Sequence, residues 1–94
     1  MNQTTLYSIF LEYRGGTYIS QVNSSGPAEA LEAWAASLPE EDLQAWNLKR
    51  DVLMPVILDG SLVSIAGLVN AWCLSGVDDD DEQLLLNVIA TVDG

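Results

Sequence analysis

The sequence lacks histidine and has a single cysteine, and each shortage excludes a class of chemistry. Without histidine there can be no Ser-His or Cys-His catalytic pair, and the commonest zinc ligand is missing. The one cysteine, Cys73, rules out an intramolecular disulfide framework and gives no argument for secretion. A nucleophilic cysteine needs a base or positive surroundings, so we interpret Cys73 as a buried structural thiol.

Cationic residues are also scarce. Arg14, Lys49 and Arg50 stand against fourteen acidic residues, and the formal net charge is −11. Three cations cannot neutralise a track of phosphates, so we expect no nucleic-acid binding. An anionic membrane surface would be repelled as well. The same negative field would attract a basic protein, although net charge also serves simply to keep a small domain soluble.

Long hydrophobic runs and targeting signals are missing too. The first five residues contain neither the basic region nor the apolar region of a signal peptide. The longest apolar stretch, residues 62–74, is interrupted by Ser64, Gly67 and Asn70 and is too short to span a bilayer. We therefore expect a cytoplasmic location and no membrane contact.

The sequence does contain enough apolar material for one core. Hydrophobic residues make up 49% of the chain and the mean hydropathy is +0.19, which is more than a disordered chain has. A chain of 94 residues fits one domain, so we expect residues 1–94 to form a single unit.

A β-hairpin is predicted at the start of the chain. Residues 5–14 and 17–24 are rich in strand-forming residues, and Gly15-Gly16 between them suits a two-residue turn. This turn would place Tyr13 opposite Tyr18 and Ile9 opposite Val22. The apolar side chains then share one face, which we expect to be the core face; it carries Tyr7, Ile9, Leu11, Tyr13, Tyr18 and Val22.

A helix is predicted next. Ser25 or Gly26 can serve as its N-cap, Pro27 suits its first turn, and Pro39 stops it near Leu38. A buried stripe follows the i, i+3, i+4, i+7 spacing and consists of Leu31, Trp34, Ala35 and Leu38. Residues 40–46 can form a second, short helix with acids at its N-terminus.

The remaining elements are expected to complete an α+β fold. Residues 52–58 contain Pro55 and are interpreted as an edge strand or an irregular segment, whereas residues 68–75 and 84–92 are predicted strands. The simplest packing is an antiparallel sheet of about four strands, with one main helix and one short helix on one face. The predicted element order is β-β-α-(α)-β-β.

The charged segment between the last two predicted strands is the most distinctive local feature. It contains five carboxylates in succession: Asp78, Asp79, Asp80, Asp81 and Glu82. A calcium loop would need alternating ligands and a glycine at a turn, so we expect no metal site and no cofactor. Two interpretations remain open, a solvated hairpin loop and an acidic patch for a basic partner.

Three apolar residues are candidates for a protein interface. Trp46 ends the short acidic helix and could anchor a partner, whereas Trp34 and Trp72 suit the core. Phe10 and Ile19 fall on the hairpin face away from the tyrosines, among polar side chains. Either a second layer or a dimer mate would cover them.

The hairpin sequence at 7–20, followed by Pro27-Ala28-Glu29-Ala30-Leu31, resembles the start of a HicB-type antitoxin domain. The resemblance covers about a third of the chain and implies a hairpin followed by a helix, in a protein that neutralises a partner. It carries no catalytic residues. The sequence is equally similar to small uncharacterised bacterial proteins with the same ββα start. The chain continues to an apolar strand where that family has a DNA-binding module, which agrees with the charge argument against DNA.

The function expected from the sequence is therefore non-enzymatic. We predict a bacterial protein-binding module, similar to an antitoxin, immunity protein or other inhibitor, for a basic partner. The alternative is a structural subunit or homodimer that uses the Phe10 and Ile19 face. A small enzyme would need buried carboxylates, and Glu40 and Glu41 instead suit the opening of a helix.

Overall fold

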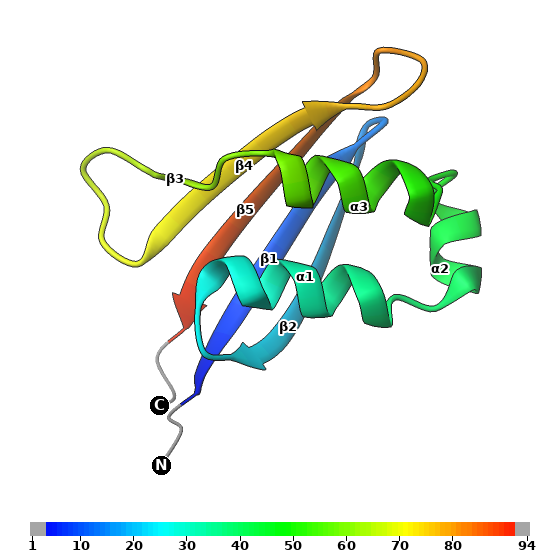
Figure 1. The fold of residues 1–94 in the computed structure, drawn as a ribbon. Coiled ribbons are helices and arrows are strands. Elements are labelled where there is room, and N and C mark those ends of the chain that lie inside the picture. The colour runs from blue at the N-terminus through cyan, green and yellow to red at the C-terminus, as the bar shows by residue number, and fades with distance from the viewer. Residues whose placement is uncertain (1–3, 92–94) are drawn as a thin grey trace.

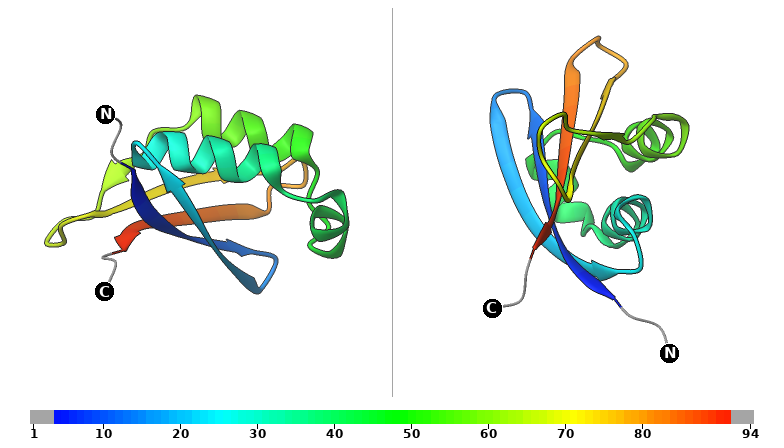
Figure 2. Two further views of the ribbon diagram at one scale, coloured as in Figure 1. Left: turned by 90° about the horizontal axis from the view of Figure 1, so that it is seen from below. Right: turned by 90° about the vertical axis from the view of Figure 1, so that its left-hand side faces the viewer.

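The computed structural model describes residues 4–91 and confirms the α+β class. Five strands form an antiparallel sheet in the order β2-β1-β5-β4-β3, and α1 and α3 lie side by side on one of its faces (Figures 1 and 2). In chain order the elements are β1 (Thr5–Tyr13), β2 (Gly16–Ser24), α1 (Pro27–Ser37), α2 (Glu40–Ala45), α3 (Arg50–Asp59), β3 (Val63–Ser64), β4 (Ala71–Val77) and β5 (Gln83–Thr91). The described chain thus has one strand and one helix more than the sequence predicted.

The hairpin turn lies one residue earlier than predicted. Arg14 and Gly15 occupy it, with φ of 49° and 80°, so Tyr13 pairs with Gly16 and Leu11 pairs with Tyr18. The predicted register is wrong by two residues. Because side chains alternate with a period of two, that shift leaves every residue on its predicted face.

Two contacts explain the earlier turn. A Cβ at Gly16 would collide with the ring of Tyr18. Gly16 is therefore needed as the first residue of β2, rather than as a turn residue. Arg14 adopts the left-handed conformation, which is unfavourable for a side chain with a Cβ. Its guanidinium lies 3.2 Å from carboxylate oxygens of both Asp78 and Asp80, which helps to offset that strain.

The core lies between the sheet and the two long helices. On the two central strands the most deeply buried side chains are fully covered: Ile9, Leu11, Leu84, Leu86 and Val88. The predicted helix stripe from Leu31 to Leu38 is buried, and Gly26 precedes α1 as its N-cap. Trp34 is buried as predicted, while Trp72 is half-buried on the core side and packs against Tyr7.

The segment 52–58 is a correction to the prediction, because it belongs to helix α3 rather than to a strand or an irregular segment. Leu53 and Ile57 are one helical turn apart and both are buried in the core. Pro55 is exposed on the opposite side of the helix, where its ring meets solvent. Burial of one apolar face has therefore outweighed the unfavourable effect of an internal proline.

The C-terminal strands agree in part with the prediction. Gly67 and Asn70 have positive φ and make the turn before β4, so that strand begins at Ala71 rather than at residue 68. The short strand β3 was not predicted. β5 has its predicted inner face, with Leu84, Leu86 and Val88 inside; the predicted last residue, Val92, lies outside the described residues.

None of the helices among residues 4–91 has the length and apolar composition needed to cross a membrane.

Candidate protein-binding surfaces

The acidic β4–β5 loop is closed by its own first residue, Asp78. The Asp78 carboxylate accepts hydrogen bonds from the backbone N–H groups of Asp80 at 2.8 Å and Glu82 at 2.9 Å. It also accepts a short hydrogen bond from the hydroxyl of Tyr13 and one from the Arg14 guanidinium at 3.2 Å. Its side chain is only 5% exposed. Asp78 therefore holds the loop onto the end of the β1–β2 hairpin.

The electrostatics of this cluster agree with its geometry. The hydrogen bond from Tyr13, together with the backbone donors and Arg14, lowers the pKa of Asp78. Burial, followed by the hydrogen bond to Asp78, raises the pKa of Tyr13. The bond between the Arg14 guanidinium and the Tyr13 hydroxyl, 3.0 Å long, raises the pKa of Arg14 further. At neutral pH the cluster is thus an ionised carboxylate held by a neutral phenol and a guanidinium.

The five predicted carboxylates consequently fall into two groups. Asp79, Asp80, Asp81 and Glu82 are exposed, and they form the acidic part of the loop that another molecule can reach. Asp78 is taken up in the fold. The sequence contained no local sign of this role, because Tyr13 and Asp78 are 65 residues apart and meet only through the pairing of β1 with β5.

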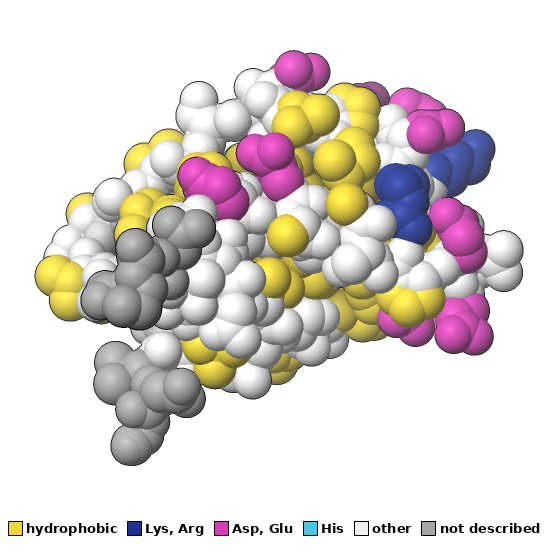
Figure 3. All heavy atoms as spheres, turned by 60° about the horizontal axis from the view of Figure 1, so that its bottom comes forward, with side chains coloured by type: hydrophobic (Ala, Val, Ile, Leu, Met, Phe, Trp, Pro, Cys, Tyr) yellow, Lys and Arg dark blue, Asp and Glu magenta, His cyan; other side chains and the backbone are white. Residues whose placement is uncertain are grey.

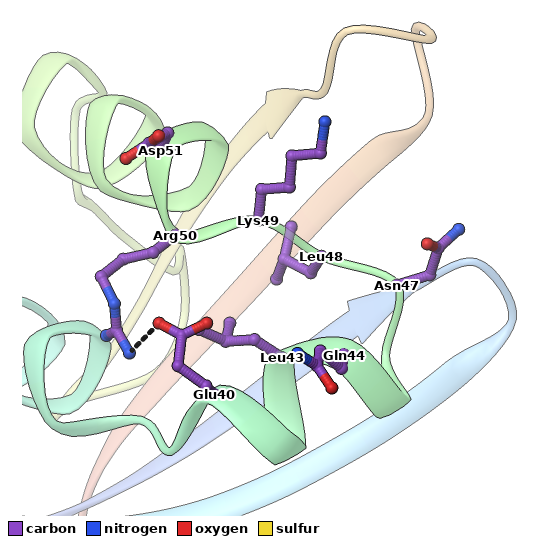
Figure 4. A pocket seen from close by; sticks show the side chains of 8 residues that line it. All are labelled: Glu40, Leu43, Gln44, Asn47, Leu48, Lys49, Arg50 and Asp51. Atoms are coloured by element: carbon purple, nitrogen blue, oxygen red, sulfur yellow. Dashed lines mark hydrogen bonds and ion pairs between the residues drawn. The ribbon is translucent and has the colours of Figure 1, made fainter.

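Two open hollows adjoin the loop at the same end of the molecule. The larger, of about 480 Å³, lies between α2 and the start of α3, with Glu40, Asn47, Lys49 and Arg50 among its lining residues (Figure 4). The smaller, of about 240 Å³, shares Asn47 and Lys49 with it and reaches the loop. All three cations of the chain line these hollows.

Two of those cations are occupied within the fold. Arg50 donates short hydrogen bonds to the backbone carbonyls of Ala35 and Leu38, and it lies 3.3 Å from Glu40, so it ties the end of α1 to α3. Arg14 is paired with the acidic loop as described above. In the described part of the chain no three Cys, Asp or Glu side chains converge as the ligands of a metal ion would.

Trp46 directly follows α2 and is half-buried. Its ring stacks on Tyr18, with 4.4 Å between the ring centroids and 23° between the planes. The pair attaches the end of α2 to strand β2, and both residues pack against the core. Trp46 thus makes a structural contact and is still partly exposed, and its role as a partner anchor stays a prediction.

Phe10 and Ile19 lie on the face of the sheet opposite to the helices and are direct cross-strand partners. The predicted face is correct, and the observed register brings the two side chains together where the predicted register did not. Ile19 is 63% exposed. The same face carries Cys73, which was predicted to be buried and is only half-buried, because no described helix covers this side.

Comparisons of this chain with protein-family models, with curated proteins and with solved structures find no significant match. The resemblance to HicB-type antitoxins therefore stays a prediction.

Proposed function

We propose that the chain is a non-catalytic protein-binding module, similar in role to an antitoxin, immunity protein or inhibitor, and that its acidic end receives a basic partner. The observation that carries this proposal is the number of carboxylates at the end of the molecule where the two hollows lie. Asp79 and Asp80 line the smaller hollow and Glu40 and Asp51 line the larger, whereas the remaining exposed acids of the loop and of α2 are Asp81, Glu82, Glu41 and Asp42.

The distribution of charge supports this surface. In Figure 3 acidic side chains are spread along the upper part of the view and gather around the cationic ones at its right-hand end. Arg14 pairs with Asp78 and Asp80 and Arg50 pairs with Glu40, but fourteen acids outnumber three cations, so the net field stays negative. Such a field accelerates association with a basic protein and aligns it before contact.

The chemistry of the acids also favours binding over catalysis. A general acid at neutral pH needs a raised carboxyl pKa, whereas the pKa of Asp78 is lowered by its hydrogen bonds. The proposal includes no cofactor, nucleic acid or membrane. It places the protein in the cytoplasm, in keeping with its single cysteine.

The test begins with the tagged chain as bait in a lysate of its host, washed first at low and then at high salt. A basic protein that high salt releases is then purified, and its dissociation constant is measured by calorimetry at 50 and 300 mM NaCl. The decisive variant is Asp79→Asn/Asp80→Asn/Asp81→Asn. Asp78 is left intact because its replacement would open the loop.

The matched control removes three charges at the other end of the helices, in Glu29→Gln/Glu32→Gln/Asp59→Asn. We expect the loop variant to bind about tenfold more weakly at 50 mM and to show a flatter salt dependence, because exposed charges act only within about a Debye length. The control should change the affinity by less than about threefold. Equal affinities for the wild type and the loop variant would contradict the proposal, as would recovery of nothing but the bait.

A further inference from the structure

The helix-free face of the sheet carries several large apolar side chains among its polar ones. Four of its large aliphatic side chains are exposed: Ile19, Val63, Val77 and Ile89. Beside Ile19 the surface has a hollow of about 300 Å³. Its apolar lining residues are Phe10, Ile65, Leu68, Ala71 and Ile89, and its polar ones are Glu12, Thr17 and Asn87. Ile19 and Val63 lie at the two ends of one row across the sheet, in which Asn87 separates Phe10 from Cys73. Exposed apolar clusters typically mark an interaction site.

Charge is almost absent from this face. Among the acidic residues of the described chain, only Glu12 has a side chain on it, near the turn end of β1. The strand β2, which forms one edge of the sheet, has no charged residue from Gly16 to Ser24. A basic partner has little to recognise here, whereas two copies that each carry −11 meet least repulsion on this side.

The face supplies most of the area that a stable dimer needs. Three strands of nine residues, one of seven and one of two, at about 3.3 Å per residue and about 4.8 Å between strands, cover about 570 Å². Specific interfaces bury about 800 Å² on each partner. Two sheets that pack face to face form the ordinary layer arrangement of a β-sandwich.

Three polar side chains on this face already have hydrogen-bond partners. Ser8 and Thr91 share a hydrogen bond of 2.6 Å between their hydroxyls, and the side-chain amide of Gln21 donates to Ser8 at 3.1 Å. These groups would keep their partners if a second layer excluded water, so covering them carries little desolvation penalty.

The projecting side chain of Ile19 and the hollow beside it suit a symmetric contact between two copies. Ile19 projects from β2, and its cross-strand partner Phe10 lines the hollow, so the two features are neighbours. A two-fold axis between them would insert each Ile19 into the hollow of the other copy. Cavities of about 150 Å³ admit benzene, and the hollow is therefore large enough for an aliphatic side chain.

We propose that this face is a homodimer interface, in which two copies of the chain pack their sheets against each other with Ile19 near the two-fold axis. The proposal does not depend on the acidic surface, which lies on the helices and the β4–β5 loop. The two proposals also predict opposite effects of salt. Binding of a basic partner weakens as salt is added, whereas self-association of an acidic chain tightens.

Sedimentation velocity of the purified chain at 1–200 µM, in 10 and 150 mM NaCl, tests this proposal. The Debye length falls from about 30 Å to about 8 Å between these conditions. We expect a reversible monomer–dimer equilibrium whose dissociation constant is at least about tenfold lower in 150 mM NaCl. A monomer throughout this range would overturn the homodimer and leave the acidic-surface proposal standing.

Paired variants separate apolar contact from general charge repulsion. Ile19→Glu makes each copy more negative and Ile19→Lys makes it less negative, yet both should raise the dissociation constant at least tenfold. Leu58→Lys is the control, because Leu58 on α3 is 59% exposed but lies on the helical side. Thermal unfolding should show that all three variants fold. A dimer that Ile19→Lys leaves intact would overturn the assignment of this face.

Discussion

Replacing Gly76 with alanine tests how closely α3 packs against β4. A Cβ built at Gly76 lies 2.7 Å from Cγ1 and 3.1 Å from Cγ2 of Val56, on the buried side of α3. Carbon atoms in good contact are about 3.5–4.0 Å apart. Either the helix or the Val56 side chain must therefore move by almost 1 Å to admit the extra methyl group.

The expected loss of stability follows from two opposing effects. Overpacking of this kind typically costs about 1–3 kcal/mol. Removing a glycine from a strand returns about 0.4–1 kcal/mol, because the unfolded chain loses conformational freedom. We expect Gly76→Ala to lower the free energy of unfolding by about 1–2 kcal/mol, out of a total of about 5–14 kcal/mol for a chain of this length.

A double-mutant cycle makes the test specific. Val56→Ala alone removes two half-buried methyl groups and should cost about 1 kcal/mol. In Gly76→Ala/Val56→Ala the added methyl occupies the vacated space, so the loss should be smaller than the sum of the single losses by about 1–2 kcal/mol. Urea unfolding followed by circular dichroism gives all three values.

Ser75→Ala serves as the control, because Ser75 is the exposed neighbour on the same strand and should change stability by less than about 0.5 kcal/mol. If Gly76→Ala were neutral or stabilising, or if the two substitutions were additive, Val56 would not lie over Gly76. The described packing of α3 against β4 would then be refuted.

Two further predictions concern α3 and the acidic loop. Pro55→Ala restores an N–H that can donate to the carbonyl of Asp51, so urea unfolding should show a gain of about 1–2 kcal/mol; a loss would argue against a helix here. Asp78→Asn should lower the melting temperature at pH 7 and flatten the acid limb of the stability profile. The pKa of Asp78 is lowered on folding, chiefly by Tyr13, so its contribution is complete above the unfolded pKa of about 3.9 and is lost as pH falls through the lower folded value. Asp79→Asn, in an exposed position of the same loop, should keep the wild-type profile, and matching profiles for both variants would refute the anchoring role of Asp78.

The hairpin illustrates how far local patterns reach. Alternation of apolar and polar residues placed Ile9 and Leu11 in the core and Phe10 and Ile19 outside it, and the structure agrees. The same pattern could not choose between Gly15-Gly16 and Arg14-Gly15 as the turn, since both keep the faces. The choice rests on the close approach of Tyr18 to Gly16 and on contacts of the Arg14 guanidinium with a loop more than sixty residues away.

The helix α3 illustrates the opposite case, in which a local rule gave the wrong answer. Pro55 disfavours a helix interior, and a strand or irregular segment followed from that rule. Leu53 and Ile57 also have helical spacing, but the free energy gained by burying them depends on the core that α1 and the sheet supply. The energy of burying that face exceeds the penalty of one missing hydrogen bond.

The candidate surfaces divide in the same way. The run of carboxylates and the outward position of Ile19 are properties of the sequence, because charge and side-chain alternation are local. The anchoring role of Asp78, the direct pairing of Phe10 with Ile19 and the hollow beside them exist only after β1 has paired with both β2 and β5. By itself the sequence determined which residues avoid water and which carry charge. The tertiary structure alone decided which of them meet, because those contacts join residues that no local pattern connects.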